Sequence, residues 1–328
     1  MYPDSFDAGI KAHRTPKGHT LVRIEWWSQP QRRSRSWYES EKRKYPTEHD
    51  FEREFEIDWH IGSGDAYFPE FNQRGGVKFY SLQTRGILAG IPVFRGWDFG
   101  VRRPAVVFGQ IDQTGRVWVY RELAPSNINI HEFRDLVLYA SGQLSYDALA
   151  AMDRRRALEI IEQINNPKSG YPLLPWFETG SLIEWVDYAG PEATARQRIQ
   201  TSSEQTDADV LLSGGIQLRT MYVKLETREA LHRALMMPRK DRYPGIIWDP
   251  ACRNLLRAMS GGLTRKKGPD GRPVGAEYNK PGLFDDLYDA ESFWLCQELD
   301  PAMMQEDGTF PRGDRLGGVD TYLQESAT

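Results

Sequence analysis

The chain has 328 residues, a size typical of one large domain with attachments or of two domains. With 40% apolar and 12% aromatic residues it can bury a sizeable core, and its net charge of -4 neither favours nor excludes a polyanionic partner. Two cysteines exclude a disulfide framework and a cysteine-rich zinc site, and the lack of a long apolar window or an apolar signal core predicts a cytoplasmic protein without a membrane partner.

Residues 1–90 are predicted to form a connector segment. The first twenty residues are polar and rich in Gly, Pro and His, which is typical of a chain end or a junction. A short strand-like run at 20–30 is followed by a charged, mostly helical stretch at 34–59 and by a loop at 62–76 with an apolar anchor. The stretch at 34–59 is expected to be a charged, mostly exposed connector.

A core is expected to begin at Ile91. Three strands are predicted at 93–97, 105–111 and 116–123, and the sequence DQTG is a strong turn signal between the second and the third. Helices are predicted at 130–139 and 146–164, and the next buried strand is predicted at 181–190.

From residue 192 to residue 300 helical and strand patterns alternate. A basic, glycine-rich segment at 264–280 precedes a last amphipathic helix, GLFDDLYDAESFWLCQELD. Residues 301–328 are polar without periodicity and are expected to form a disordered tail. A mixed α/β domain is thus expected at 91–300.

The order of these elements predicts the fold class. Three antiparallel strands, helices, and then a strand parallel to the first make an α/β fold with a mixed sheet flanked by helices on both faces. Ligands of open α/β sheets bind at the carboxyl ends of the parallel strands.

Acidic residues stand at this expected edge. Asp98 ends the first strand and Asp187 ends the strand predicted beside it, so their carboxylates are expected to emerge together. On the last helix Asp289 shares a face with Asp286 and also with Asp285, because residues three and four apart are neighbours on a helix. The apolar stripe of that helix would pack it on the sheet with an acidic edge toward the strand ends.

Clustered carboxylates repel one another, and a divalent cation relieves the repulsion. Oxygen ligands without a nearby His or Cys set favour Mg²⁺ or Mn²⁺ over zinc. Two such ions, bridged by one aspartate, support phosphodiester hydrolysis. One aspartate at the end of each of two strands, followed by an aspartate on a helix, is the order found in a ribonuclease H-like nuclease.

Each acid also has a structural explanation. An acid at a strand end is commonly a turn or cap residue, and acids in the first turn of a helix favour its dipole. For Asp249, which is followed by Pro250, the turn explanation is preferred. For Asp98, Asp187 and the helix acids, convergence in one fold favours the metal-site hypothesis.

The chain from about Trp26 to Leu299 resembles the C-terminal part of phage large terminase subunits, the DNA-packaging motor proteins. The resemblance covers the nuclease domain and the connector before it. It is carried by the motifs SWYESEKRKYP, FEREFEIDW and GDAYFPEF in the connector and by GWDFG, VDYAG, IIWDPACRNLLRAM and FDDLYDA in the nuclease part.

The resemblance implies a ribonuclease H-like nuclease that cuts concatemeric viral DNA with a carboxylate-held pair of Mg²⁺ or Mn²⁺ ions, in the cytoplasm of an infected bacterium. Asp98 is then the bridging ligand, Asp187 and Asp289 each bind one metal, and Asp286 is auxiliary. Whether Asp285 or Asp286 is auxiliary stays open. Portal protein and a small terminase subunit are implied partners. No phosphate-cradling G-x-x-x-x-G-K-[ST] motif occurs, so the motor ATPase would be missing or separate.

Contacts to double-stranded DNA are expected from basic residues that bind backbone phosphates. Arg102 and Arg103 directly follow the first strand and are the first candidates. Arg265, Lys266 and Lys267 lie in the segment before the last helix and are the second. The DRRR run at 153–156 is interpreted as a solvated helix face.

Other functions fit less of the sequence. The sequence DFG also occurs in protein kinases, whose glycine-rich loop, strand lysine and H-R-D loop are missing. An actin-like ATPase needs a small-residue hairpin where this chain has VRRP. A resolvase or transposase with the same fold, and a non-catalytic module that docks on DNA or the portal ring, remain alternatives.

Overall fold

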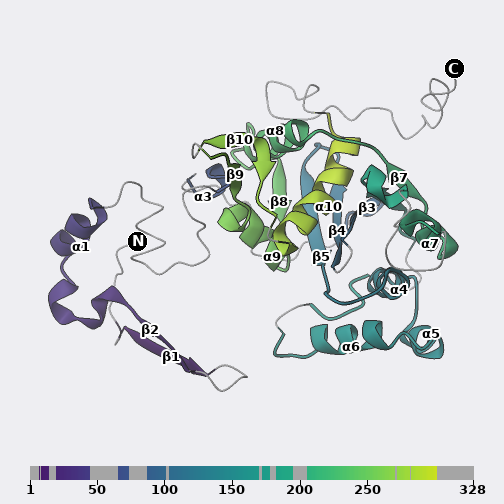
Figure 1. Cartoon of the computed structure of the whole chain (residues 1–328), viewed down its shortest axis with the longest axis horizontal. Coiled ribbons are helices and arrows are strands. Elements are labelled where there is room, and N and C mark those ends of the chain that lie inside the picture. Colours follow the sequence, from purple (N-terminus) through teal and green to yellow (C-terminus); the bar gives the residue numbers. More distant parts are fainter. Residues whose placement is uncertain are drawn as a thin grey trace.

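The computed structural model describes residues 7, 9–14, 20–44, 66–73, 87–100, 103–169, 172–177, 182–194, 205–269, 272–280 and 282–300. A six-stranded mixed sheet is its centre (Figure 1). The strands are β3 Val93–Phe99, β4 Pro104–Ile111, β5 Val117–Leu123, β6 Trp185–Ala189, β7 Leu218–Thr220 and β8 Ile246–Trp248.

The strands lie in the order β7-β6-β3-β4-β5-β8. β3, β4 and β5 form the predicted antiparallel meander, and β6 lies parallel to β3 as expected. β7 and β8 extend the sheet in parallel at its two edges. Only β4 therefore runs against the others, and the α/β fold with a mixed sheet that the sequence predicted is confirmed, with β8 added beside β5.

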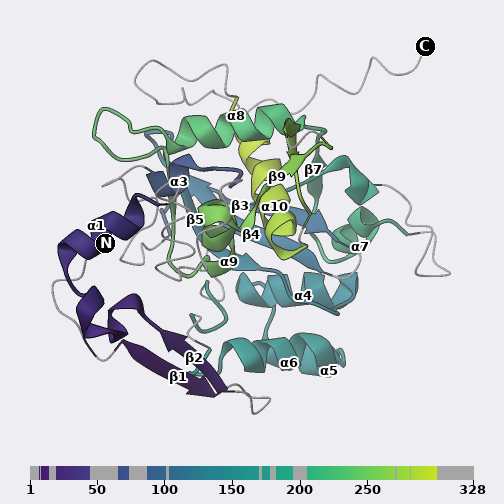
Figure 2. The same ribbon diagram turned by 60° about the vertical axis from the view of Figure 1, so that its left-hand side comes forward.

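Helices cover both faces of this sheet. One face carries α4 Ile130–Ala140 and α7 Asp207–Ser213, and α6 Arg155–Ile164 packs on α4 in a second layer, which Figure 2 shows below the sheet. Those on the other face are α8 Leu225–Met236, α9 Arg253–Arg257 and α10 Leu283–Glu298.

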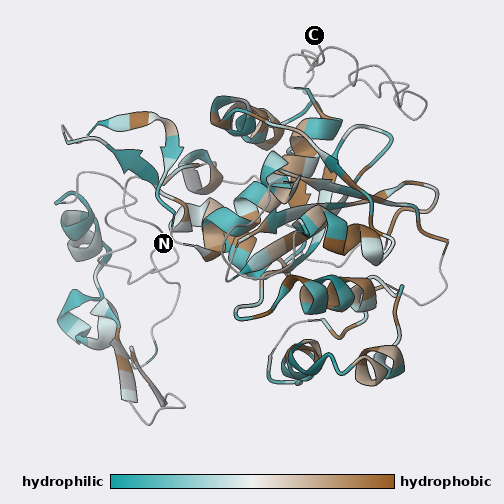
Figure 3. Ribbon diagram, turned by 45° about the vertical axis from the view of Figure 1, so that its right-hand side comes forward, coloured by the Kyte–Doolittle hydropathy of each residue, from teal (hydrophilic) through white to brown (hydrophobic). Residues whose placement is uncertain are grey.

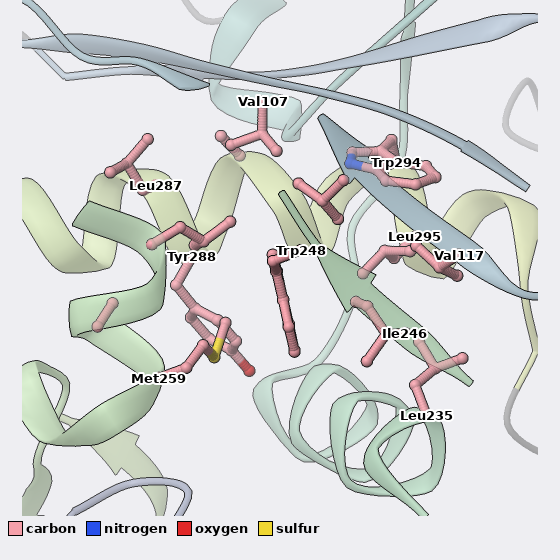
Figure 4. Packing of buried hydrophobic residues seen from close by; sticks show 14 of the residues in the cluster. Val107, Val117, Leu235, Ile246, Trp248, Met259, Leu287, Tyr288, Trp294 and Leu295 are labelled. Atoms are coloured by element: carbon pink, nitrogen blue, oxygen red, sulfur yellow. The ribbon is translucent and has the colours of Figure 1, made fainter. Parts of the chain in front are cut away.

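Each face has its own hydrophobic cluster, as expected when successive side chains of a strand alternate between faces. In β3, Phe94 belongs to the cluster beneath α10, whereas Val93 and Trp97 belong to the cluster beneath α4. Figure 4 shows Trp248 of β8 at the centre of the first cluster. Hydrophobic residues concentrate where strands and helices meet (Figure 3).

Two glycines allow α10 to lie directly on the sheet. A Cβ added to Gly96 of β3 would stand 1.9 Å from the carbonyl oxygen of Ala290, and one added to Gly109 of β4 would stand 2.6 Å from the indole of Trp294. No side chain fits between the strand and the helix at these points. The close approach fixes where the first turns of α10 stand relative to the end of β3.

The segment predicted as a connector contains two parts. A hairpin of β1 Ile10–Arg14 and β2 Thr20–Ile24 precedes α1 Arg35–Lys42, and these elements lie to one side of the sheet (Figure 1). Tyr67 and Phe68, just before the short helix α3 Glu70–Gln73, are instead fully buried in the cluster beneath α10. Residues 45–65 lie outside the described part.

Two local predictions differ from the structure. The helix expected at 146–164 is divided into α5 Tyr146–Ala151 and α6 because Asp153 adopts a φ of 52°, which a helix does not tolerate. The basic segment before the last helix forms a hairpin of β9 Arg265–Lys267 and β10 Pro273–Tyr278. The tail expected at 301–328 lies outside the described residues. No helix in the described part is long and apolar enough to cross a bilayer.

Candidate functional site: a carboxylate cluster at the end of β3

Asp98 is the penultimate residue of β3 and points to the face covered by α10. Strand alternation places Asp98 on the same face as Phe94 and Gly96, and Gly96 touches α10 at Ala290. Two residues along a strand span about 7 Å, so Asp98 extends past this contact toward the carboxyl edge of the sheet. The side chain is half-buried.

The predicted helix acids lie in the first two turns of α10, opposite Asp98. Gly100, directly after β3, is so close to α10 that an added Cβ would stand 3.7 Å from Oδ1 of Asp286. Asp285 is the N3 residue of the helix, and its Oδ1 accepts a hydrogen bond from the backbone N–H of Gly282 at 2.5 Å. Because Asp285 caps the helix, the structure favours Asp286 as the residue that faces the end of β3.

These carboxyl groups influence one another strongly. Burial and then repulsion from Asp289, Asp286, Glu192 and Asp285 raise the pKa of Asp98 well above its usual range. Burial and then the neighbouring Asp285 raise the pKa of Asp286 to about 7. Burial also raises the pKa of Asp289 and of Asp285. The cluster therefore holds more negative charge than its surroundings compensate, unless it takes up protons or a cation.

Asp187 does not join this cluster, contrary to the expectation that it emerges beside Asp98. It is the middle residue of β6, paired with Arg95 rather than with the end of β3. Its carboxylate accepts hydrogen bonds from Nε and Nη2 of Arg95 at 2.6 and 2.7 Å and from Nε1 of Trp97 at 2.7 Å. Since Arg95 and Trp97 are on the face beneath α4, Asp187 lies on the side of the sheet opposite Asp98.

Glu192, and not Asp187, is the acid after β6 that acts on Asp98. It lies in a 3-10 turn, η3 Pro191–Thr194, directly after β6. Its carboxylate folds back over Gly190, where an added Cβ would stand 2.1 Å from Oε1, and it is among the charges that raise the pKa of Asp98. Strand periodicity could not indicate Glu192, because its position depends on the turn and not on the strand.

Asp289 is held by donors from two other elements. Its Oδ1 accepts a hydrogen bond from Nη1 of Arg228 in α8 at 2.8 Å and another from the hydroxyl of Tyr278 in β10 at 2.5 Å. Both donors oppose the effect of burial on the pKa of Asp289. Burial, and next the charge of Asp289, raise the pKa of Tyr278 far above its usual value, so the phenol remains a donor.

A buried polar network between α8 and α10 supports this arrangement, through His232, one turn after Arg228, and Glu291, two residues after Asp289. His232 of α8 contacts the carbonyl oxygen of Arg228 through Nδ1 at 2.9 Å and Oε2 of Glu291 through Nε2 at 3.0 Å. Oε1 of Glu291 accepts a hydrogen bond from Nε1 of Trp248 at 2.6 Å. A fully satisfied network of this kind rigidifies the packing of the two helices.

The predicted DNA-binding cations occupy different settings. Arg103 stands beside the N-terminus of α10 and lowers the pKa of Asp285 and Asp286, whereas Arg102 lies outside the described residues. Arg265 pairs with Glu229 and lies over the ring of Tyr67. Lys266 pairs with Glu277 at 2.5 Å, and Lys267 is exposed on β9.

Lys280 is a further cation at the cluster that the sequence analysis missed. It is exposed just before α10, and it lowers the pKa of Asp285, Asp286 and Asp289. Together with Arg103 it gives the acidic cluster a cationic margin. A single lysine in a loop carries no sequence signal that distinguishes it from a solvated surface residue.

The chemistry of these side chains fits a hard divalent cation. The carboxylates around Asp98 raise its pKa and offer oxygen as their only donor atom, which is typical of Mg²⁺ or Mn²⁺ ligands. Within the described residues, no three His, Cys, Asp or Glu side chains already stand close enough together to hold a metal ion. The carboxylates lie at one edge of the sheet but do not converge on a single position.

Two solved structures are similar to this chain. One is the nuclease domain of the large terminase g2p from bacteriophage SPP1 with bound Mn, at 15% identity, covering 68% of this chain and 99% of that one, with a TM-score of 0.37. The other is the large terminase nuclease from the thermophilic phage G20c with bound magnesium, at 14% identity, covering 71% of this chain and 97% of that one, with a TM-score of 0.37. No protein-family profile and no curated protein sequence matches the chain.

Proposed function

We propose that this protein is a divalent-metal-dependent DNA endonuclease of the large-terminase type, which hydrolyses phosphodiesters of concatemeric viral DNA during genome packaging. In this role it would act in the host cytoplasm with a motor ATPase, a portal protein and a small terminase subunit. The observation that carries the proposal is the carboxylate cluster of Asp98, Asp286, Asp289 and Glu192 at the carboxyl edge of a ribonuclease H-like sheet.

The cluster would hold one or two Mg²⁺ or Mn²⁺ ions. Asp98 comes from a central strand and its pKa is raised by Asp289, Asp286, Glu192 and Asp285, which suits a bridging role for Asp98, with Asp289 and Glu192 as further ligands. Asp286 is the auxiliary carboxylate. When bound, a pair of such ions supplies a nucleophilic water and stabilises the leaving oxygen of the phosphodiester.

DNA would be held through its phosphates at the margin of the cluster. Arg103 and Lys280 both lower the pKa of Asp286, and in this proposal they would bind the phosphates next to the scissile bond. Contacts of this kind position the backbone without reading bases, which suits an enzyme that must cut many sequences. Arg265 and Lys266 are engaged with carboxylates on their own hairpin or on α8 and are weaker candidates.

Plasmid cleavage by the purified chain tests the proposal. We expect nicking and linearisation of several unrelated plasmids with Mn²⁺ or Mg²⁺ and none with a chelator. Asp98→Asn should abolish cleavage, and Glu192→Gln should lower it by about tenfold to a hundredfold, the range for loss of a group that orients or binds a metal.

A binding measurement separates a lost site from a lost fold. A metal that binds only the native state raises the melting temperature as its concentration rises, so Mn²⁺ should stabilise the wild type and not Asp98→Asn. Absence of both cleavage and Mn²⁺ stabilisation in the wild type would reject the nuclease and favour a non-catalytic docking module. Cleavage confined to branched DNA would instead favour a resolvase.

A further inference from the structure

The Oδ1 atom of Asp289 is the most heavily engaged oxygen of the carboxylate cluster. Two hydrogen bonds reach this one atom, from Nη1 of Arg228 at 2.8 Å and from the hydroxyl of Tyr278 at 2.5 Å. A carboxylate oxygen offers about two lone-pair sites, so these two donors occupy Oδ1. Only Oδ2 of Asp289 is left to bind a cation.

Arg228 is a fixed donor. Its Nε donates to the carbonyl oxygen of Val223 at 3.1 Å, and its guanidinium lies 4.5 Å from the ring centroid of Phe293 on α10. Only 7% of the residue is exposed. A guanidinium anchored in this way holds Oδ1 and cannot turn outward to a phosphate.

Tyr278 is equally well fixed. It ends β10, is 5% exposed, and packs edge-on against the rings of Tyr67 and Tyr288 at 5.4 and 5.5 Å between centroids. Its ring orientation is therefore set by neighbours that do not belong to the carboxylate cluster. The hydroxyl is delivered to Oδ1 by the packing of the hairpin.

We propose that Tyr278, together with Arg228, is a specificity-determining positioning residue that makes Asp289 a one-oxygen ligand and so favours Mg²⁺ or Mn²⁺ over Ca²⁺. This inference rests on the proposed metal-dependent function. Mg²⁺ requires near-ideal octahedral geometry with single oxygens, whereas Ca²⁺ takes six to eight oxygens and readily accepts both oxygens of one carboxylate. Blocking Oδ1 withholds from Ca²⁺ a contact that the smaller ions do not need.

The test uses Mn²⁺ binding, which does not depend on cleavage. The electron paramagnetic resonance signal of free Mn²⁺ is titrated with the full chain, and Ca²⁺ is added as a competitor to give the ratio of the two dissociation constants. Tyr278→Phe keeps the ring packing and frees one lone-pair site on Oδ1. It should weaken Mn²⁺ binding by about tenfold and narrow the preference for Mn²⁺ over Ca²⁺ by about as much.

Tyr67→Phe is the matched control. The Tyr67 hydroxyl donates to the carbonyl oxygen of Ala276 at 2.7 Å, so this variant also removes one buried hydrogen bond to the hairpin without touching Asp289. Tyr67→Phe should keep the wild-type ratio of the Mn²⁺ and Ca²⁺ dissociation constants. Arg228→Lys is the second variant: it keeps the charge but loses the anchored fork, and it should narrow the ratio in the same direction.

The outcomes are distinguishable. If the wild type binds Mn²⁺ and Asp98→Asn does not, but Tyr278→Phe keeps the wild-type ratio, the inference about Tyr278 is wrong and the nuclease proposal stands. If Tyr278→Phe weakens the binding of Mn²⁺ and of Ca²⁺ equally, the inference about Tyr278 is also wrong. If the wild type binds no Mn²⁺, both the proposed function and this inference are overturned.

Discussion

Asp187 and Arg95 form a two-pronged ion pair inside the sheet, with distances of 2.6 and 2.7 Å between guanidinium nitrogens and carboxylate oxygens. Both residues are almost completely buried on the face beneath α4. The remaining nitrogen of Arg95, Nη1, donates to Ser141 at 3.1 Å and to Gln143 at 2.7 Å. This pair ties β3, β6 and the end of α4 together.

Neutralising Asp187 is therefore expected to damage the fold. Asp187→Asn leaves the charge of Arg95 buried without a counter-charge, and breaking a buried pair in this way costs roughly 3–5 kcal/mol of unfolding free energy. Asp286→Asn is the matched control, since it removes a carboxylate whose pKa is raised to about 7 by burial and nearby acids. That variant should leave stability unchanged or raise it.

Urea unfolding followed by circular dichroism checks both variants. The contrast between them is the decisive quantity, because each replaces one aspartate by asparagine. If Asp187→Asn were as stable as the wild type and lost only Mn²⁺ binding, Asp187 would be a metal ligand and the ion pair with Arg95 would be dispensable.

The sequence predicted the parts of the site that follow from periodicity. Alternation in β3 and the spacing of acids on α10 were sufficient to bring Asp98 and Asp286 to one edge, and Asp249 forms the predicted turn, with its Oδ1 accepting from the backbone of Ala251. Asp187 was misplaced because β6 continues two residues beyond it and pairs Asp187 with Arg95, whose side chain is on the face opposite Asp98. Register and strand ends depend on pairing partners that one sequence does not reveal.

The residues that donate hydrogen bonds to Asp289 could not be predicted from the sequence, for a related reason. Arg228 and Tyr278 lie 61 and 11 residues from Asp289 in the chain, and only the packing of α8 and β10 brings them to the same oxygen atom. Neither residue stands in a motif, and an arginine on an amphipathic helix is ordinarily read as solvated. The buried network of His232 and Glu291 is hidden in the same way.

Glu122 predicts a pH dependence of stability away from the candidate metal site. Burial, with a smaller effect of Glu291, raises its pKa from 4.5 to about 7, against hydrogen bonds from Asn254 and Leu255 at the start of α9. The native state then holds a proton that the unfolded state releases above pH 4.5. The contribution of Glu122 to stability should fall as the pH rises from about 4.5 to about 7, by about 1.4 kcal/mol per unit of pKa difference.

The comparison of the wild type with Glu122→Gln isolates this group from the other carboxyls. An amide does not ionise, so the unfolding free energy of the wild type minus that of the variant should decrease over this pH range and level off above it. Chemical denaturation at several pH values measures the difference. A constant or rising difference would mean that the hydrogen bonds at α9 outweigh burial and that Glu122 is ionised throughout.

Gly96 predicts a steric limit on the approach of α10. Gly96→Ala would place a methyl group against the carbonyl oxygen of Ala290, where backbone on both sides prevents relaxation. Inserting a carbon into a packed core costs roughly 1–3 kcal/mol and occasionally more, and we expect the upper end. Displacement of α10 should also weaken Mn²⁺ stabilisation, because the helix carries Asp286 and Asp289.

Gly215→Ala is a suitable control for the conformational part of such a substitution. Gly215 has a φ of 81° and open space around the position of an added Cβ, so only left-handed strain of about 1–2 kcal/mol is expected. Thermal or urea unfolding compares the two variants. Equal losses, with unchanged Mn²⁺ stabilisation in Gly96→Ala, would show that α10 shifts at no cost to the carboxylate cluster.

Arg103 and Lys280 predict the salt dependence of DNA binding, if both bind phosphates at the margin of the cluster. Each phosphate contact contributes about 0.9 to the slope of log K against log salt on duplex DNA. Arg103→Ala and Lys280→Ala should each lower the slope by about one and weaken binding alike on unrelated sequences. Fluorescence anisotropy of labelled duplexes with a chelator present, between about 50 and 200 mM salt, measures this. Arg155→Ala is the control, because Arg155 is exposed, is paired with Asp153 at 2.8 Å, and lies on α6, which packs on the side of the sheet opposite α10. A loss of slope for Arg155→Ala equal to that for Arg103→Ala would place the DNA on the helical face of α6 and separate it from the carboxylate cluster.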